Sequence, residues 1–413
     1  MTRTPATLGL TSATLGAALI CPGIAEADFF ADSKASLELR NFYFNSDYHQ
    51  DNASQSKRDE WAQGFLLDYE SGFTEGPVGF GVDVSGLLGV KLDSGPDRQN
   101  SGLLPVGDDK APDDYSRLGA TAKARVSKTV LKVGTLMPRL PMVLPNDGRL
   151  LPQTFRGALV TSKDIDGLTL NVGRLTSNTL RNDSSHADIE ASAKGLKGGK
   201  PSDRFDLLSA NYAWNKQLVT GYHYSELEDN YDQHIFTLLH TLPLGEGQSF
   251  KTDLRYADSG SKGNSNIDNR AFGARLTYSI AGHSFGAAWQ TMKGETGFPH
   301  LDGTDSFLVN YVMISPDFAN PDEKSWQARY DFDFAKVGIP GLTFMTRYLR
   351  GDNYMRGRVE AKEWERNTDI AYAFQSGPLK NLELRWRNGS YRSGGSNDID
   401  QNRVIVSYTI PLL

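Results

Sequence analysis

The stretch Leu382-Glu383-Leu384-Arg385-Trp386-Arg387 alternates strictly between apolar and charged side chains. In an extended strand, successive side chains point to opposite faces, so the apolar residues share one face and the charged residues share the other. The same alternation recurs along the chain, in residues 118–126, 168–172, 250–256, 272–280, 285–289, 326–334 and 370–374. Polar breaks rich in Gly, Asn and Asp separate these runs, and no stretch with a helical period competes with them. The pattern predicts an all-β chain.

The composition alone does not decide between a soluble sheet and a membrane-embedded sheet. Of the 413 residues, 38% are hydrophobic, and the mean hydropathy is −0.45. After the first 27 residues, no segment offers the 18 consecutive apolar residues of a spanning helix. A barrel remains possible, because only alternate residues of each strand face lipid. The rival interpretation is a soluble sandwich whose polar face meets bulk water.

The C-terminal run favours the barrel. Its residues Val404, Val406, Tyr408, Ile410 and Leu412 form one apolar face that continues to the end of the chain. A barrel must close its last strand on its first, and a terminal strand with an apolar outer face suits that closure. Many barrels end in an aromatic residue, whereas this chain ends in leucine. At about 20 to 24 residues per strand and connection, the chain has room for roughly sixteen to eighteen strands.

The N-terminus has the layout of a secretory signal peptide. Arg3 precedes an apolar stretch over residues 8–20, and Ala25-Glu26-Ala27 is a small-x-small cleavage site. We therefore expect two regions, a signal peptide over residues 1–27 and an outer-membrane β-barrel channel over residues 28–413. The expected location is integral in the outer membrane of a Gram-negative bacterium, in contact with outer-membrane lipid and lipopolysaccharide.

The only cysteine, Cys21, lies within the expected signal peptide, so the mature chain would carry no thiol. A lipoprotein is the alternative, but the bulky Ile20 does not fit the small residue that lipoprotein processing favours before the cysteine. The net charge of −6 argues against nucleic acid as a partner. It does not describe the charge inside a pore.

The connections between the alternating runs differ in length, as a barrel requires. Residues 241–247 and 377–381 are short turns, which we expect on the periplasmic side. Longer polar stretches are expected outside the cell, at residues 93–117, 178–203, 257–270, 351–366 and 392–402.

One connection differs from all others. Residues 137–157, MPRLPMVLPNDGRLLPQTFRG, contain four prolines, which exclude a central strand. The segment also has too many apolar residues for a free external loop. In a wide barrel it can fold into the lumen, narrow the channel and offer Arg139 and Arg149 to a passing solute. The alternative is a loop packed on the outer rim of the barrel.

Three segments resemble the OprD family of outer-membrane carboxylate channels. They are MPRLPMVLPNDGRLLPQTFRGALVTSKDIDGL (137–168), FPHLDGTDSFLVNYVMISPDFANPDEKSWQARYDFDFA (298–335) and GPLKNLELRWRN (377–388). The resemblance runs from about Asp28 to Leu413. It implies a single antiparallel barrel of 18 strands, with the loops at 137–157 and 298–311 folded inward as a constriction. It also implies a row of arginines that draws carboxylates through the pore and faces an acidic patch.

The resemblance implies a passive porin for small carboxylate-bearing solutes, without a cofactor. Residues 298–301 and 307–310 look closer to the branch for cyclic or aromatic carboxylates than to the branch for basic amino acids, which stays as the alternative. We expect a monomer or a weak trimer. A non-selective diffusion porin and an outer-membrane barrel hydrolase are further rivals.

Alternation places several arginines inside the barrel, because a charge that faces hydrocarbon costs about 2 to 4 kcal/mol at the midplane. The substrate-binding candidates are Arg149, Arg275, Arg347, Arg385, Arg387, Arg403, Asp302 and Asp305. Arg255 and Arg329 also take inner positions. A guanidinium grips a carboxylate with two parallel hydrogen bonds. The alternative for each arginine is an ion pair with a lumen acid such as Glu383, and the two aspartates are also ordinary turn residues.

Catalytic and metal-binding patterns are missing from the sequence. No serine lies in the strand–turn–helix context of a nucleophile elbow, and the histidines at 223, 234 and 240 have no H-E-x-x-H spacing or paired cysteine. We therefore expect no catalytic residue, no metal site and no enzymatic activity.

Overall fold

The computed structural model describes residues 26–50, 53–314, 318–394 and 398–413. It contains a short helix α1 (Glu26–Ala31), twenty strands and one 3₁₀ turn (Phe334–Val337). The strands are β1 (Lys34–Tyr48), β2 (Lys57–Glu70), β3 (Gly79–Asp93), β4 (Asp114–Val126), β5 (Thr129–Leu136), β6 (Thr154–Ser162), β7 (Leu168–Thr179), β8 (Ala191–Ser192), β9 (Phe205–Ala213), β10 (Leu218–Leu227), β11 (Tyr231–Gly245), β12 (Gln248–Ser261), β13 (Asp268–Ile280), β14 (His283–Lys293), β15 (His300–Leu301), β16 (Lys324–Asp333), β17 (Leu342–Arg356), β18 (Val359–Ala373), β19 (Leu382–Ser393) and β20 (Ile399–Pro411).

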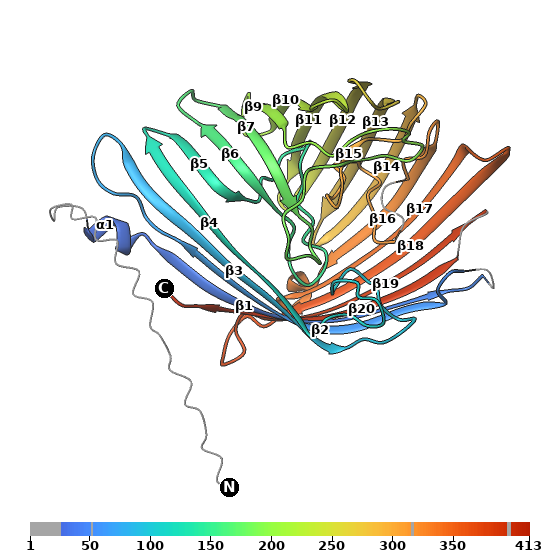
Figure 1. Ribbon diagram of the computed structural model, residues 1–413, viewed down its shortest axis with the longest axis horizontal. Coiled ribbons are helices and arrows are strands. Elements are labelled where there is room, and N and C mark those ends of the chain that lie inside the picture. Colours follow the sequence, from blue (N-terminus) through green and yellow to red (C-terminus); the bar gives the residue numbers. More distant parts are fainter. Residues whose placement is uncertain (1–25, 51–52, 315–317, 395–397) are drawn as a thin grey trace, which may run out of the picture.

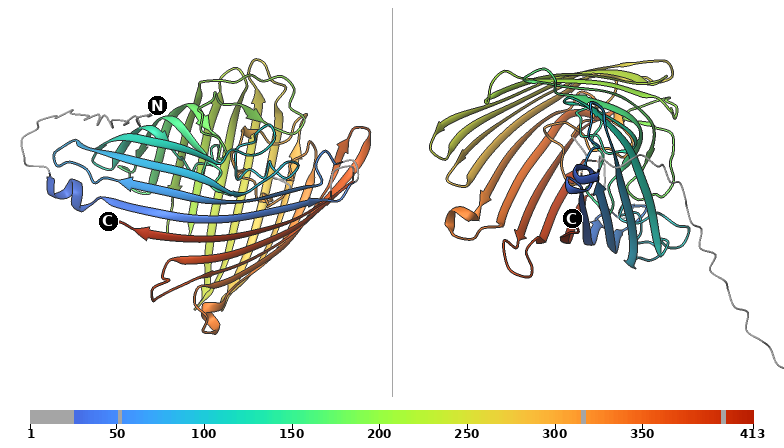
Figure 2. Two further views of the ribbon diagram at one scale, coloured as in Figure 1. Left: turned by 60° about the horizontal axis from the view of Figure 1, so that its bottom comes forward. Right: turned by 90° about the vertical axis from the view of Figure 1, so that its left-hand side faces the viewer.

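Eighteen of these strands form one closed antiparallel sheet. Each strand pairs with its neighbours along the chain, and β1 pairs with β2 on one side and with β20 on the other. Figure 2 shows this seam, with the first strand in blue beside the last strand in red. The predicted 18-stranded barrel, closed by the C-terminal strand, is confirmed. The short strands β8 and β15 pair only with each other.

The period of two in the sequence sorts side chains between the two faces of the wall. Trp289, Trp326 and Trp386 lie on the outer face and are 40–48% exposed. Trp289 and Trp326 are direct cross-strand neighbours. On the inner face of the same strands, Gln290 and Gln327 are buried against a loop inside the barrel. In the part of the chain that the structure describes, no helix has the length and apolar character needed to cross a membrane.

The two ends of the barrel differ. Two-residue turns at 127–128, 246–247 and 281–282 close one end, where Leu412 also donates a hydrogen bond to Ala35. Long connections gather at the opposite end. Because outer-membrane barrels have short periplasmic turns and longer outer loops, the end with the long connections faces outward.

Several stretches expected as external loops are strand in large part. Residues 257–270 and 351–366 extend β12, β13, β17 and β18, and only residues 262–267 and 357–358 connect them. Their polar residues lie in strands at the end of the wall that carries the long connections, so low apolar content did not indicate a loop. The connection within 93–117 folds back on the barrel, since Leu103 and Leu104 are fully buried.

Three further long connections fill part of the lumen. We call them loop A (residues 137–153), loop B (residues 180–204) and loop C (residues 294–314 and 318–323). Figure 1 shows them inside the curve of the wall. Their apolar side chains form the main core with the inner faces of β5 to β14, through residues such as Val143, Ile189, Phe298 and Leu308. This core occupies one side of the lumen. A second, smaller cluster, with Phe42, Phe44 and Leu150, packs against β1 to β4, and the side of β17 to β20 stays largely polar.

Residues 1–25 of the expected signal peptide lie outside the described residues, so cleavage before Asp28 stays a prediction. The described barrel begins at Lys34 and ends at Pro411.

Candidate functional site

Loops A, B and C meet inside the barrel and hold one another in place. The backbone N–H of Asp305 in loop C donates to the carbonyl of Leu144 in loop A at 2.8 Å. The Gln153 side chain donates to the carbonyl of Asp302 at 2.9 Å. In loop B, β8 pairs with β15 of loop C. The inward placement expected for residues 137–157 therefore holds for residues 137–153, which form loop A, whereas residues 154–157 begin β6. Residues 298–311 also lie inside the barrel as expected, within loop C.

The barrel wall fixes loop C through buried polar side chains. Glu365 on β18 accepts hydrogen bonds from the backbone N–H groups of Met313 (3.1 Å) and Ile314 (2.9 Å). Asn310 donates from its backbone to Gln290 at 3.0 Å and from its side chain to Ser325 at 2.8 Å. Gly389 faces the same segment, and a Cβ there would lie 2.7 Å from Cε of Met313. Loop C is thus held against β14, β16, β18 and β19.

Two hollows lie along the polar side of the lumen. The constriction hollow, of about 510 Å³, lies among the three loops and the wall, and its lining includes Arg149, Arg181, Asp305, Arg387 and Arg403. The lower hollow, of about 400 Å³, continues toward the periplasmic end, and its lining includes Arg40, Glu38, Glu383 and Arg385. The two hollows share Gly148, Arg149 and Arg387. A solute that moves from one to the other passes between these residues.

Three guanidinium groups of the constriction hollow have no carboxylate partner. Within the described residues, no carboxylate oxygen lies within 4 Å of a guanidinium nitrogen of Arg149, Arg181 or Arg403. Arg149 donates to the carbonyl of Ser101 at 2.9 Å, and Arg403 donates to the carbonyl of Met313 at 2.7 Å. Both lie over the ring of Phe44, at 4.9 and 5.5 Å. Carbonyl dipoles and ring faces hold these cations without neutralising them.

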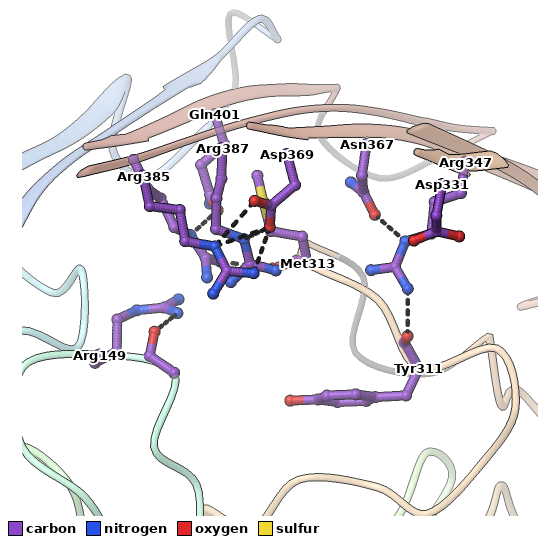
Figure 3. A network of polar contacts seen from close by, with 12 residues as sticks. Arg149, Tyr311, Met313, Asp331, Arg347, Asn367, Asp369, Arg385, Arg387 and Gln401 are labelled. Atoms are coloured by element: carbon purple, nitrogen blue, oxygen red, sulfur yellow. Dashed lines mark hydrogen bonds and ion pairs between the residues drawn. The ribbon is translucent and has the colours of Figure 1, made fainter. Parts of the chain in front are cut away.

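Asp369 on β18 clamps two further arginines, as Figure 3 shows. It accepts from Nε (2.9 Å) and Nη2 (2.7 Å) of Arg385. Nε of Arg387 lies 3.0 Å from Oδ2 of the same carboxylate. One negative charge thus faces two positive charges. Arg387 is also the direct cross-strand neighbour of Arg403.

Two predicted site residues lie apart from both hollows. Arg347 donates to Oδ1 of Asn367 at 2.8 Å and to the carbonyl of Tyr311 at 3.2 Å. Arg275 donates to the carbonyl of Val309. Both therefore bind the backbone of loop C. Arg139 lines a separate hollow of about 420 Å³ together with Asp68 and Asp83.

The predicted acidic residues Asp302 and Asp305 face the arginines from loop C. Asp305 accepts from Nδ2 of Asn146 at 2.6 Å and from the hydroxyl of Tyr311. Burial raises the pKa of Asp305 above its usual value, although the Tyr311 hydroxyl and the nearby arginines oppose the shift. Burial, and to a smaller extent repulsion from Arg181, lowers the pKa of Arg149 to about 9. Arg149 therefore keeps its charge at pH 7. The hollow therefore has a cationic wall and an acidic loop.

The sequence did not point to Arg40, Arg181, Tyr311 or Asp369. Arg181 falls in a stretch expected to be external, and Tyr311 lies beside the quoted loop segment without a pattern of its own. Arg40 shares its strand face with Phe42 and Phe44, which are buried inside the lumen. These inward aromatic residues hide the alternation that would have marked Arg40.

A family model described as "outer membrane porin, OprD family" matches residues 27–412. The porin-like protein GalP of Pseudomonas putida is 40% identical over 406 residues, with 97% of each chain covered. Among solved structures, OpdQ of Pseudomonas aeruginosa is 53% identical, with a TM-score of 0.87 and coverage of 94% of this chain and 100% of that one. A BenF-like porin of Pseudomonas fluorescens Pf-5 is 41% identical, with a TM-score of 0.89 and coverage of 93% and 100%.

The closed barrel, the three inward loops and these similarities agree on one kind of protein, a non-enzymatic channel integral to the outer membrane of a Gram-negative bacterium. The chain belongs to the OprD family of outer membrane porins.

Proposed function

We propose that the channel takes up small carboxylate-bearing solutes passively, through the constriction lined by arginines, and that it favours cyclic or aromatic carboxylates. The observation that carries this proposal is the set of three unpaired guanidinium groups, Arg149, Arg181 and Arg403, around the constriction hollow. Cations this close together repel one another, and a carboxylate between them relieves that repulsion.

Successive arginines suit transport as well as binding. From the constriction hollow, a carboxylate meets Arg149 and Arg387 at the shared boundary and then Arg385 and Arg40 in the lower hollow. A guanidinium offers parallel donors that match a carboxylate. Arg40 already donates from Nε and Nη2 to Glu38 and from Nη1 to Asp147, so it is a partly neutralised site. Passage requires sites that attract a solute without trapping it, and the partial neutralisation of Arg385 and Arg387 by Asp369 keeps these sites shallow.

The preference for a ring rests on the apolar part of the constriction. Val312, Met313 and Ile314 line the hollow beside the arginines. In the lower hollow, Phe42 and Ile405 lie near Arg149 and Arg387. A solute with a carboxylate on one edge and an apolar ring on the other would contact both kinds of surface.

A channel for basic amino acids is the second candidate. The observation in its favour is the acidic side of the same path, made by Asp147, Asp302 and Asp305. An amino acid could place its ammonium group there and its carboxylate at the arginines. We rank it second because Asp305 accepts hydrogen bonds from Asn146 and Tyr311 and is thus already engaged.

The test replaces two loop arginines together, Arg149→Gln with Arg181→Gln, so that the wall strands stay intact. A unit charge about 7 Å from a solute in a water-like dielectric changes its energy by about 0.6 kcal/mol, roughly threefold in occupancy. We expect the anion-to-cation permeability ratio in planar bilayers to fall by at least about threefold. Benzoate entry into proteoliposomes should fall in parallel. The matched control is Arg156→Gln with Arg174→Gln, two exposed cations outside both hollows.

Three outcomes separate the candidates. If the ratio and benzoate entry fall in the loop variant alone, the carboxylate pathway is supported. If the native channel passes arginine faster than benzoate, the basic-amino-acid channel replaces the ring-carboxylate preference. If uptake of every solute rises linearly with concentration and ignores the substitutions, the channel is a non-selective porin.

We also propose that the outer face meets outer-membrane lipid and lipopolysaccharide, as its exposed tryptophans favour. The expected monomer or weak trimer stays a prediction, which light scattering in detergent tests.

A further inference from the structure

The connection between β3 and β4 contains a turn, residues 101–102, that lies against two of the constriction arginines. We call these two residues the corner. The backbone carbonyl of Ser101 accepts a hydrogen bond from Nε of Arg149 at 2.9 Å. Gly102 lies against the guanidinium of Arg181. Among the described residues that line the two hollows, neither Ser101 nor Gly102 occurs. The corner therefore supports both arginines from outside the solute path.

Only glycine fits at position 102 while Arg181 keeps its place. A Cβ at this position would lie 2.9 Å from Nη2, 3.1 Å from Nε and 3.3 Å from Cζ of Arg181. The guanidinium thus lies across the point that a Cβ would occupy. The backbone φ of +81° is also in the left-handed region, which glycine adopts without strain. Within the described residues, the Arg181 side chain donates no hydrogen bond, so a methyl group here would displace the guanidinium before it displaced the backbone.

Glu60 on β2 ties the corner to the barrel wall. Its side chain is fully buried, and its carboxylate accepts hydrogen bonds from the backbone N–H of Ser101 at 3.0 Å and from the Ser101 hydroxyl. The same hydroxyl accepts from the N–H of Leu103 at 3.1 Å. Hydrogen bonds to an ionised acceptor are stronger than neutral ones. The Ser101 carbonyl that holds Arg149 therefore has a fixed place relative to the wall.

The remaining contacts of Arg149 leave one edge of its guanidinium free. Glu60 is the direct cross-strand neighbour of Phe44, whose ring lies 4.9 Å from Cζ of Arg149. The hydrogen bonds to the carbonyls of Ser101 and Gly148 use Nε and Nη1. Within the described residues, Nη2 donates no hydrogen bond, so it stays available to a solute carboxylate. Without the bond to Ser101, the guanidinium would be free to rotate over the ring.

We propose that the corner positions Arg149 and Arg181 in the constriction, and that Glu60 is the anchor of the corner. Ser101 and Gly102 are thus positioning residues, which set the anion preference of the pore through the two arginines. This inference rests on the proposed function, because it takes both arginines as groups that attract carboxylates. It assigns their arrangement to a connection outside the solute path.

The experiment uses two substitutions in the intact channel that change no charge. Gly102→Ala should push the guanidinium of Arg181 from the corner toward the acidic side of the same hollow, where Asp302 and Asp305 partly neutralise it. The anion-to-cation permeability ratio in planar bilayers should therefore fall by about twofold. Single-channel recording measures only channels that have folded and inserted, so a low yield of the variant does not affect the readout.

Ser101→Ala tests the support of Arg149. It removes the hydroxyl that joins Glu60 to the N–H of Leu103, so the corner loosens and the permeability ratio should again fall by about twofold. The control is Ser209→Ala, which removes a buried hydroxyl that is hydrogen-bonded to Nδ1 of His223 at 2.8 Å. This variant should keep the native ratio.

Double-mutant cycles show whether each effect passes through its arginine. Gly102→Ala should have no further effect in an Arg181→Gln channel, and Ser101→Ala none in an Arg149→Gln channel. Gly377→Ala is the control for backbone strain. Its φ is +75°, and among the described residues a Cβ there would meet no atom within 4 Å, so this variant should select ions as the native channel does.

The outcomes separate this inference from the proposed function. If the arginine variants lower the ratio and the two charge-neutral variants do not, the positioning role is overturned and the arginine pathway stands. Equal effects of the charge-neutral variants with and without their arginines would also overturn the positioning role. If Arg149→Gln and Arg181→Gln themselves leave the ratio unchanged, the proposed function fails, and the positioning role fails with it.

Discussion

At the residue scale, Asp369 determines how much positive charge the polar wall presents to a solute. Its carboxylate accepts from Arg385 at 2.7 Å and lies 3.0 Å from Arg387. Asp369 is buried, and 8% of its side chain is exposed. Its charge is therefore not dispersed by water, and it offsets part of the field of both guanidinium groups.

Asp369→Asn should raise the anion preference of the pore. The substitution keeps the shape of the side chain and removes the one negative charge between two arginines, so we expect about a threefold higher anion-to-cation permeability ratio. Reversal potentials in a salt gradient measure this ratio. Asp331→Asn is the matched control, because Asp331 holds Arg329 with two hydrogen bonds of 2.6 and 2.7 Å but lines neither hollow. An equal change in both variants would contradict a local effect at the constriction.

Asp305 should make the selectivity depend on pH. Because burial raises its pKa, this carboxyl takes up a proton at a higher pH than an ordinary aspartate does. Protonation removes a negative charge from the constriction, so the anion preference should rise as the pH falls from 7 to about 4.5. Asp305→Asn should show the higher preference already at pH 7 and a smaller change on acidification.

Asp302→Asn serves as the comparison for this pH profile, since Asp302 lines the same hollow. The pH step should persist in this variant. If the step disappears in Asp302→Asn and persists in Asp305→Asn, the assignment of the titrating group is wrong.

The direction of the wall arginines was predictable, because hydrocarbon excludes a charge from the other face. Their partners were not. Arg385 and Asp369 are 16 positions apart in the sequence and meet only through the register of β18 and β19. Arg347 and Arg275 have the same inward direction as Arg387, yet they bind carbonyl groups of loop C. Alternation gives the face of a residue but not what lies in front of it.

At the scale of elements, loop C sets the width of the channel, and its position depends on a few buried hydrogen bonds. Glu365 accepts from two consecutive backbone N–H groups of this loop. A buried donor that loses its acceptor costs about 1 to 3 kcal/mol. Releasing both donors would make the inward position of residues 313–314 much less favourable.

Glu365→Ala should therefore widen or loosen the constriction. We expect larger single-channel conductance with more frequent fluctuations, because loop C loses its attachment to β18. Glu246→Ala, in an exposed turn at the periplasmic end, is the control and should conduct as the native channel does. Unchanged conductance in Glu365→Ala would show that the remaining contacts hold the loop alone.

Sequence patterns predicted the elements unevenly. The prolines of residues 137–157 predicted an inward loop, because a segment that is both apolar and unable to form a central strand must pack against something. Loop B gave no such signal, since its polar residues resemble those of any exposed connection. It is held in the lumen by β8, a strand of two residues that pairs with β15 of loop C, and period-two analysis cannot detect strands this short.

At the scale of the whole molecule, the barrel divides its lumen into two parts. Apolar side chains of loops A, B and C fill the side of β5 to β14. The route past Arg149 and Arg387 runs along the other side. The alternating pattern predicted the closed wall, but the division of the lumen depends on contacts between residues more than 100 positions apart, such as Asn146 with Asp305.

The central claim is that solutes pass Arg149, and a single introduced thiol tests it most directly. Because the only cysteine of the sequence, Cys21, falls in the predicted signal peptide, Arg149→Cys would carry one reactive thiol. Single-channel current is recorded while sulfonatoethyl or trimethylammonium-ethyl methanethiosulfonate reacts with it, and Arg156→Cys on the outer face is treated in the same way. Both reagents should lower the conductance of the Arg149→Cys channel and leave the conductance of Arg156→Cys unchanged. In Arg149→Cys, the sulfonate should lower the anion preference further, whereas the ammonium should restore it. Current and selectivity that stay constant after complete labelling at position 149 would contradict the account.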